Sequence, residues 1–173
     1  MNIRETLASG QSKANTTAIV EYIGSNGERF AELMKIFFAG EYRPTQRAAW
    51  SISVCAEKRP ELLAPYLSKL IDQLPRKGVH NAVKRNVVRL LHYVAIPKRL
   101  HGKVYSHCID LIADPAEAAA VRAFAITVAE KIAGAEPVLR DELRLVVSQN
   151  MAGATPAIKV RVRNILSDGK RAK

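Results

Sequence analysis

The stretch VYSHCIDLIADPAEAAAVRAFAITVAEKIA, residues 104–133, carries the clearest structural signal in the chain. Its first half has apolar residues at helical spacing, and its second half is a run of alanine and other apolar residues. Proline is tolerated in the first turn of a helix but not in its interior. The dipeptide Asp114-Pro115 therefore predicts the start of a second helix, with Asp114 as its N-cap and Gly134 as its stop.

The same local pattern occurs elsewhere in the chain. A helix breaker is followed seven residues later by an arginine in four places: Gly40 with Arg47, Gly78 with Arg85, Pro115 with Arg122, and Pro156 with Arg163. A recurrence of about 40 residues built from two helices is typical of helical repeat proteins. Such proteins present a long surface, so the pattern indicates binding more strongly than catalysis.

The remaining sequence shows helical periodicity and no convincing strand alternation. We expect nine helices, at residues 13–23, 28–39, 44–57, 60–74, 79–94, 97–113, 115–133, 137–150 and 156–167. The short linkers predict an opening helix followed by four antiparallel hairpins, 28–57, 60–94, 97–133 and 137–167. No interior stretch looks like a domain linker, so we expect a single domain over 1–173, with frayed ends at 1–10 and 168–173.

The unit at residues 104–133 resembles a HEAT repeat, in which Asp114, Pro115, Val121 and Arg122 match the family pattern. The resemblance implies an all-α superhelix of about four HEAT-like hairpins plus an N-terminal helix, whose second helices line a concave surface. HEAT units commonly place an aspartate shortly before the arginine, which makes a ladder of contacts between repeats. Here Asp114 is eight residues before Arg122, and Arg85 has no acidic residue nearby, so an acid of a neighbouring repeat would have to supply the contact.

Composition indicates an ordinary globular protein, with 48% hydrophobic and 25% charged residues. The start MNIRETLASG lacks the apolar run of a secretion signal, and the longest apolar stretch, 116–129, is interrupted by charges, so no membrane span is expected. Cys55 and Cys108 show no CxxC spacing, which fits buried thiols in a reducing compartment. We therefore expect a cytoplasmic protein.

Positive charge is concentrated between Gln73 and Ile109, a window without any acidic residue, in a chain of net charge +11. An excess of this kind favours acidic partners. We expect the anion-binding surface to be formed by Lys84, Arg85, Arg89, His92, Arg47, Arg122, Lys159 and Arg163. The first four fall on one face of their helix, opposite its apolar stripe. A solvated helix face remains the alternative for that group, and a packing role is favoured for Arg122.

No pattern indicates catalysis, a metal or a cofactor. The histidines at 80, 92, 101 and 107 lack metal-ligand spacing, and there is no phosphate-binding loop. Helical-repeat alkylpurine DNA glycosylases use tryptophans and a catalytic aspartate in a basic groove, but here Trp50 is alone and Val54 stands one turn further on. Trp50 is therefore interpreted as a packing residue between repeats.

The prediction is a non-catalytic scaffold that presents a basic concave surface to an acidic protein or peptide, without a small-molecule substrate. A DNA or RNA duplex is the alternative partner, and a glycosylase-like enzyme is a remote third reading.

Overall fold

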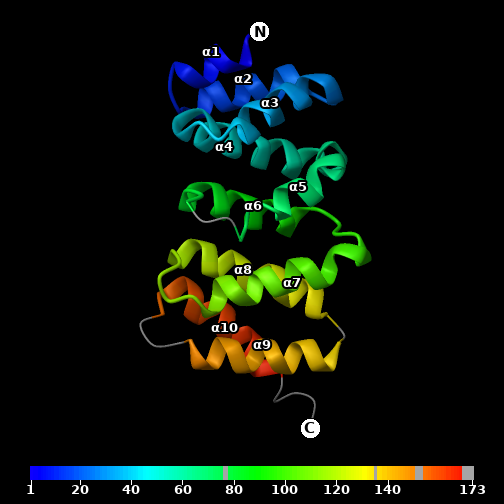
Figure 1. Cartoon of the computed structure of the whole chain (residues 1–173), viewed down its shortest axis with the longest axis vertical. Helices are drawn as coiled ribbons and strands as arrows, with labels where there is room; N and C mark the ends of the chain where they lie inside the picture. The colour runs from blue at the N-terminus through cyan, green and yellow to red at the C-terminus, as the bar shows by residue number, and fades with distance from the viewer. Residues whose placement is uncertain (76–77, 135, 151–153, 169–173) are drawn as a thin grey trace. The chain divides into compact units, whose positions relative to one another are not determined.

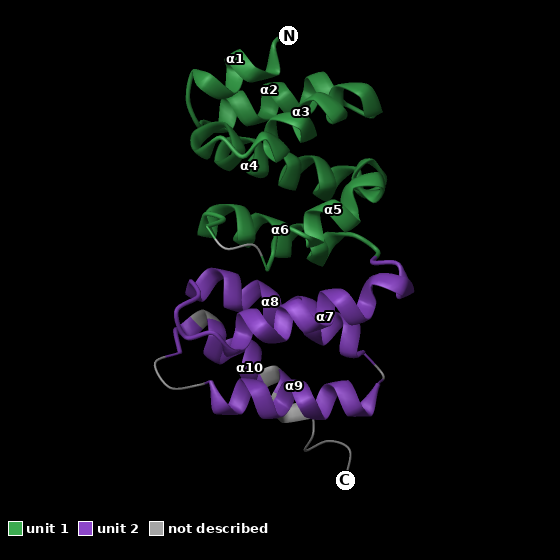
Figure 2. Ribbon diagram, viewed as in Figure 1, with its two compact units in different colours: residues 1–95 green, residues 96–173 purple. Residues whose placement is uncertain are grey.

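The computed structural model describes residues 1–75, 78–134, 136–150 and 154–168, and every regular element in these ranges is a helix. The chain forms two compact units, residues 1–95 and 96–173 (Figure 2), each of which is described by itself. The first unit contains α1 (Ile3–Ala8), α2 (Lys13–Ile23), α3 (Gly27–Ala39), α4 (Tyr42–Lys58), the 3-10 helix η1 (Pro60–Tyr66), α5 (Leu67–Ile71) and α6 (Asn81–Tyr93). The second contains α7 (Lys98–Ala113), α8 (Ala119–Ala133), α9 (Pro137–Gln149) and α10 (Pro156–Asp168) (Figure 1).

Helices pack in consecutive pairs, which confirms the all-α prediction. In the first unit α3 packs on α4, and α4 packs in turn on α6. In the second unit α7 packs on α8, and α8 packs on α10. In each unit, therefore, the two helices that follow the breakers pack on each other: α4 on α6 in the first unit, and α8 on α10 in the second. The cores between these helices are aliphatic and aromatic, and include the fully buried side chains of Phe30, Leu33, Ile52, Val128 and Ala129.

The boundary at Asp114 was predicted wrongly. Asp114 is the C-cap of α7 in an extended conformation, and α8 begins at Ala119, with Ala118 as its N-cap. The side chain of Asp114 accepts a hydrogen bond from the backbone amide of Ala116 at 2.8 Å, so it closes a turn through Pro115 instead of capping a helix. A residue before proline is driven away from helical dihedral angles, and the turn delays the start of α8.

The segment predicted as one helix over 60–74 is divided into η1 and the short α5. Pro65 lies inside the segment, where its ring lacks an amide hydrogen and crowds the carbonyl of the preceding turn. The tighter 3-10 geometry accommodates it. The opening segment also differs from the prediction, since residues 3–8 of the stretch expected to fray form α1, with Ile3 and Leu7 buried. Residues 169–173 lie outside the described part of the chain.

Candidate functional site

The basic face of α6 lies in the first unit, and three of its four predicted residues share one side of the helix. Its inner side buries Val87, Val88, Leu90 and Leu91, while Lys84, Arg85 and Arg89 are partly buried and His92 is exposed. Lysine and arginine stems cover apolar surface while their charged ends reach solvent. Ala82 and Asn86 are buried as well, and the position of Lys84 around the helix falls between those of Leu91 and Val88. Arg85, Arg89 and His92 therefore form a basic row on the remaining side of α6, and Lys84 does not belong to it.

Arg89 joins this row to α4. Its guanidinium carbon is 5.2 Å from the ring centroid of Trp50 and 5.9 Å from that of Tyr93, one turn further along α6. A terminal nitrogen of Arg89 is 3.7 Å from a carboxylate oxygen of Glu57 on α4. Trp50 is partly buried, and its ring contacts Arg89 of α6, so it takes part in the contact between α4 and α6. We call Arg85, Arg89, Trp50, Tyr93 and Glu57 the α4–α6 face.

Glu57 was missed at the sequence level as a member of this face. The signal was present, because Glu57 lies seven residues after Trp50, a helical spacing that returns to the same side. What the sequence could not supply was the packing of α4 against α6 that brings the two helical faces together.

Arg85 differs from Arg89 in having no partner among the described residues. Its side chain is partly buried, and among the described residues its guanidinium makes no hydrogen bond or ion pair. A guanidinium carries five N–H donors in a plane. Those of Arg85 are therefore available to solvent or to a ligand.

Arg47 and Arg122, at the equivalent places in their repeats, use their guanidinium groups internally. Arg47 donates to the carbonyl oxygens of Leu7 and Ala8, at the end of α1. Arg122 donates through Nε to Ile112 and through Nη2 to Asn150, each at 3.1 Å.

The last carbonyl groups of a helix lack internal donors and carry partial negative charge. These two arginines therefore contact carbonyl groups at helix ends, where other HEAT units have an aspartate. The contacts of Arg122 fit the packing role favoured for it from the sequence.

The remaining predicted cations belong to the second unit. Lys159 and Arg163 are exposed on α10. Arg161, between them in sequence, turns toward α8, where its Nε donates to the hydroxyl of Thr127 at 3.0 Å and its guanidinium lies 5.7 Å from the ring centroid of Phe124. The predicted residues are therefore divided between the units.

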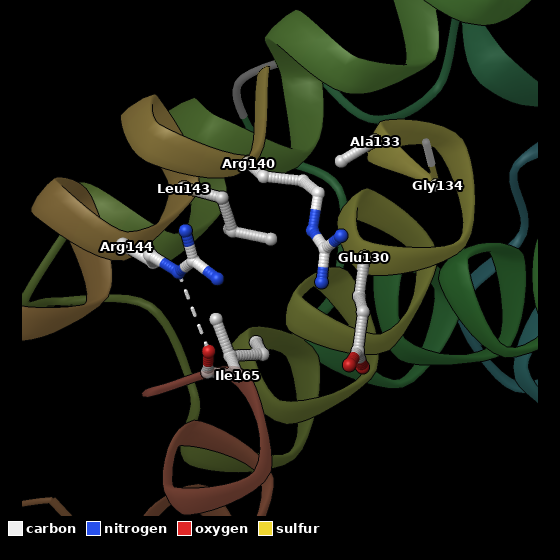
Figure 3. Close-up of a pocket in the computed structure, with 7 residues that line it drawn as sticks. All are labelled: Glu130, Ala133, Gly134, Arg140, Leu143, Arg144 and Ile165. Atoms are coloured by element: carbon white, nitrogen blue, oxygen red, sulfur yellow. Dashed lines mark hydrogen bonds between the residues drawn. The ribbon is translucent and has the colours of Figure 1, made fainter. Parts of the chain in front are cut away.

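A pocket of about 230 Å³ opens in the second unit, between the end of α8 and the helices α9 and α10 (Figure 3). Its lining residues are Glu130, Ala133, Gly134, Arg140, Leu143, Arg144 and Ile165. Arg144 is held by the carboxylate of Asp141 at 3.0 Å and by the carbonyl oxygen of Ile165 at 3.4 Å. No motif in the sequence pointed to this pocket, although Arg140 and Arg144 stand one helical turn apart.

Groups suited to covalent or metal chemistry are not assembled in the part of the chain that the structure describes. No cluster of three histidine, cysteine or carboxylate side chains there could hold a metal ion. Cys55 and Cys108 are buried as expected, and burial raises the pKa of each thiol from 9.0 to about 12. A thiol with so high a pKa is a poor nucleophile near neutral pH. Among the described helices, none has the length and apolar character that crossing a bilayer requires.

Comparison with known proteins identifies the repeat. A family model described as a HEAT repeat domain matches residues 3–168, which is nearly the whole chain and includes both units. No curated protein and no solved structure matches it.

Proposed function

This chain belongs to the HEAT repeat family, whose members typically act as protein-interaction scaffolds, and we propose that it is a non-catalytic module that binds an acidic segment of a partner protein. We place the partner on the α4–α6 face of the first unit. The family model spans both units, which supports the inference that they act as one module.

The observation that carries the proposal is that two neighbouring arginines of α6, Arg85 and Arg89, differ in their contacts. Arg85 has no partner among the described residues, whereas Arg89, on the next turn, is positioned by Trp50. Arginine, tryptophan and tyrosine dominate the binding energy of protein interfaces, because they combine large contact area with planar hydrogen bonding. A partner carboxylate can bind Arg85 in a bidentate manner while an apolar neighbour covers Trp50.

Glu57 favours a protein partner over a nucleic acid. Its carboxylate lies 3.7 Å from Arg89 and is about half exposed, so it places a negative charge on the same face. A phosphate backbone carries only negative charge and would be repelled there, whereas a protein segment can place a cation or an amide opposite Glu57. The net charge of +11 would still accelerate the approach of an acidic partner.

The test is a fluorescence anisotropy titration with two labelled probes, a peptide of alternating glutamate and leucine and a DNA duplex. The variant carries Arg85→Gln and Arg89→Gln, and the control carries Lys13→Gln and Lys35→Gln, which removes the same charge from exposed positions of α2 and α3. We expect the Arg85/Arg89 variant to bind the peptide about tenfold more weakly or worse, and the control to lose only the smaller effect of net charge.

Two outcomes contradict the proposal. If both variants lost the same peptide affinity, the loss would be due to net charge and not to the α4–α6 face. Tighter binding of the duplex, with a log–log salt slope of roughly −3 to −5 that the Arg85/Arg89 variant makes shallower by about one to two, would establish the nucleic-acid alternative in its place.

A further inference from the structure

We propose that the pocket between α8, α9 and α10 binds the C-terminal residue of a partner chain, an aliphatic residue with a free carboxylate. That the ligand belongs to a protein rests on the proposed function. The residues that line the pocket all lie in the second unit, so the inference does not depend on the α4–α6 face.

Arg140 supplies the charge that the carboxylate needs. It lies in the first turns of α9, it is partly buried, and its guanidinium points into the pocket (Figure 3). Within the described residues its side chain has no hydrogen bond or ion pair, whereas Arg144, one turn on, is already held by Asp141 and by the carbonyl of Ile165. The N-terminal end of a helix adds partial positive charge. An anion in the pocket could therefore pair with a guanidinium that makes no hydrogen bond or ion pair within the described residues.

The size and lining of the pocket restrict the ligand to one residue. Its volume of about 230 Å³ is below the roughly 300–1,000 Å³ of pockets that enclose drug-sized molecules. The side chains of Ala133, Leu143 and Ile165 are buried and form its apolar wall. A carboxylate held in bidentate fashion by Arg140 would place an aliphatic side chain of valine or leucine size against that wall.

Glu130 limits the charge of the ligand. It is an exposed residue near the end of α8, on the side of the pocket that also includes Ala133 and Gly134, the C-cap of that helix. A carboxylate and a helix C-terminus both repel anions. Repulsion of this kind is larger for a dianion such as a phosphate group than for a single carboxylate, which is therefore the better tolerated anion beside Arg140.

The test is a nuclear magnetic resonance titration of the full chain with acetyl-Gly-Leu, as the free acid and as the C-terminal amide. We expect the acid to shift the methyl resonances of Leu143 and Ile165 and the Nε–H resonance of Arg140, with a dissociation constant of about 1 mM, typical of a small ligand making few contacts. The amide should bind about tenfold more weakly, because it offers Arg140 no charge. In Arg140→Gln the acid and the amide should become equivalent, whereas Arg99→Gln, an exposed control on α7, should leave the difference intact.

Several results would overturn the inference. They are equal binding of acid and amide by the unaltered protein, an unchanged preference in a folded Arg140→Gln variant, and tighter binding of inorganic phosphate than of the acid. If free leucine bound as tightly as the acetylated peptide, the pocket would be a small-molecule site, and the proposal of a partner's C-terminal residue would be wrong. The Arg85/Arg89 variant should retain these shifts, so failure here and failure of the proposed α4–α6 face are distinguishable.

Discussion

The guanidinium of Arg89 lies over the indole ring of Trp50, with its central carbon 5.2 Å from the ring centroid. The contact joins α6 to α4, which are packed on each other. It also restricts the arginine, whose side chain is only 21% exposed although it is charged. The same contact therefore contributes to packing between helices and orients a cation on the surface.

Removing Trp50 and Arg89 separately and together should reveal coupling between them. Cation–π contacts at partly exposed sites contribute about 0.5–1 kcal/mol, so the double-mutant cycle with Trp50→Leu and Arg89→Met should give a coupling free energy of about that size. Urea unfolding of the four proteins measures it. The cycle of Trp50→Leu with Arg85→Met is the control, and coupling as large in that cycle would show that general charge effects, not the stacked geometry, are responsible.

Arg122 should matter more for stability than Arg85, although both follow the same sequence pattern. The hydrogen bonds from Arg122 to Ile112 and Asn150 satisfy carbonyl groups at two helix ends. Losing hydrogen bonds made by a charged group costs about 1.5–3 kcal/mol, so Arg122→Met should lower the free energy of unfolding by about that amount. Arg85→Met should change it by less than about 0.5 kcal/mol, as is usual for side chains without partners. Equal losses in urea unfolding would contradict the assignment of Arg122 to packing.

Much of the fold was predictable because helix periodicity and breakers are local signals. The bounds 13–23 were predicted as observed, and Gly40 and Gly134 end their helices as expected. The errors arose where a local rule competed with another. Pro65 divides a segment whose apolar spacing is helical, and Asp114 closes a turn where its position before an apolar run favoured an N-cap. The short helix α1 is stabilised by packing on its neighbours, which a six-residue sequence does not reveal.

The candidate site was less predictable, because its members depend on contacts between helices. Arg85 and Arg89 could be placed on one face of α6 from their spacing alone, whereas the position of Lys84 falls within the buried side of that helix. Whether an arginine is available for binding depends on carbonyl groups distant in sequence. Arg47 contacts the carbonyl of Ala8, whereas Arg85 has no such contact within the part of the chain that the structure describes. The prediction of one domain over 1–173 stays a prediction.

Gly78 should not tolerate alanine, whereas Gly102 should improve with it. Gly78 has a φ of 80°, in the left-handed region, where a side chain costs about 1–2 kcal/mol even though no atom crowds its position. Gly102 lies inside α7, also with no crowding atom, and glycine there is about 0.5–1 kcal/mol less favourable than alanine. Thermal unfolding should show a lowered melting temperature for Gly78→Ala and a raised one for Gly102→Ala. The same sign for both would contradict these backbone assignments.

The buried thiols should make the protein less stable at alkaline pH. Burial is the largest cause of the rise in the pKa of Cys55 and Cys108 from 9.0 to about 12, with Lys58 and Arg59 partly opposing it at Cys55. Above pH 9 the unfolded chain loses these protons while the folded chain keeps them, so the stabilisation is complete below pH 9 and is lost as pH rises toward 12. Each thiol contributes at most about 1.4 kcal/mol per pH unit in this window.

Urea unfolding between neutral pH and the alkaline range measures this effect. The free energy of unfolding should decline less steeply with pH in the Cys55→Ala/Cys108→Ala variant, whatever the stability of that variant at neutral pH. Burial also raises the pKa of Tyr105, next to Glu142, so some decline should remain. An identical decline in the variant would mean that the two thiols ionise alike in the folded and unfolded chain.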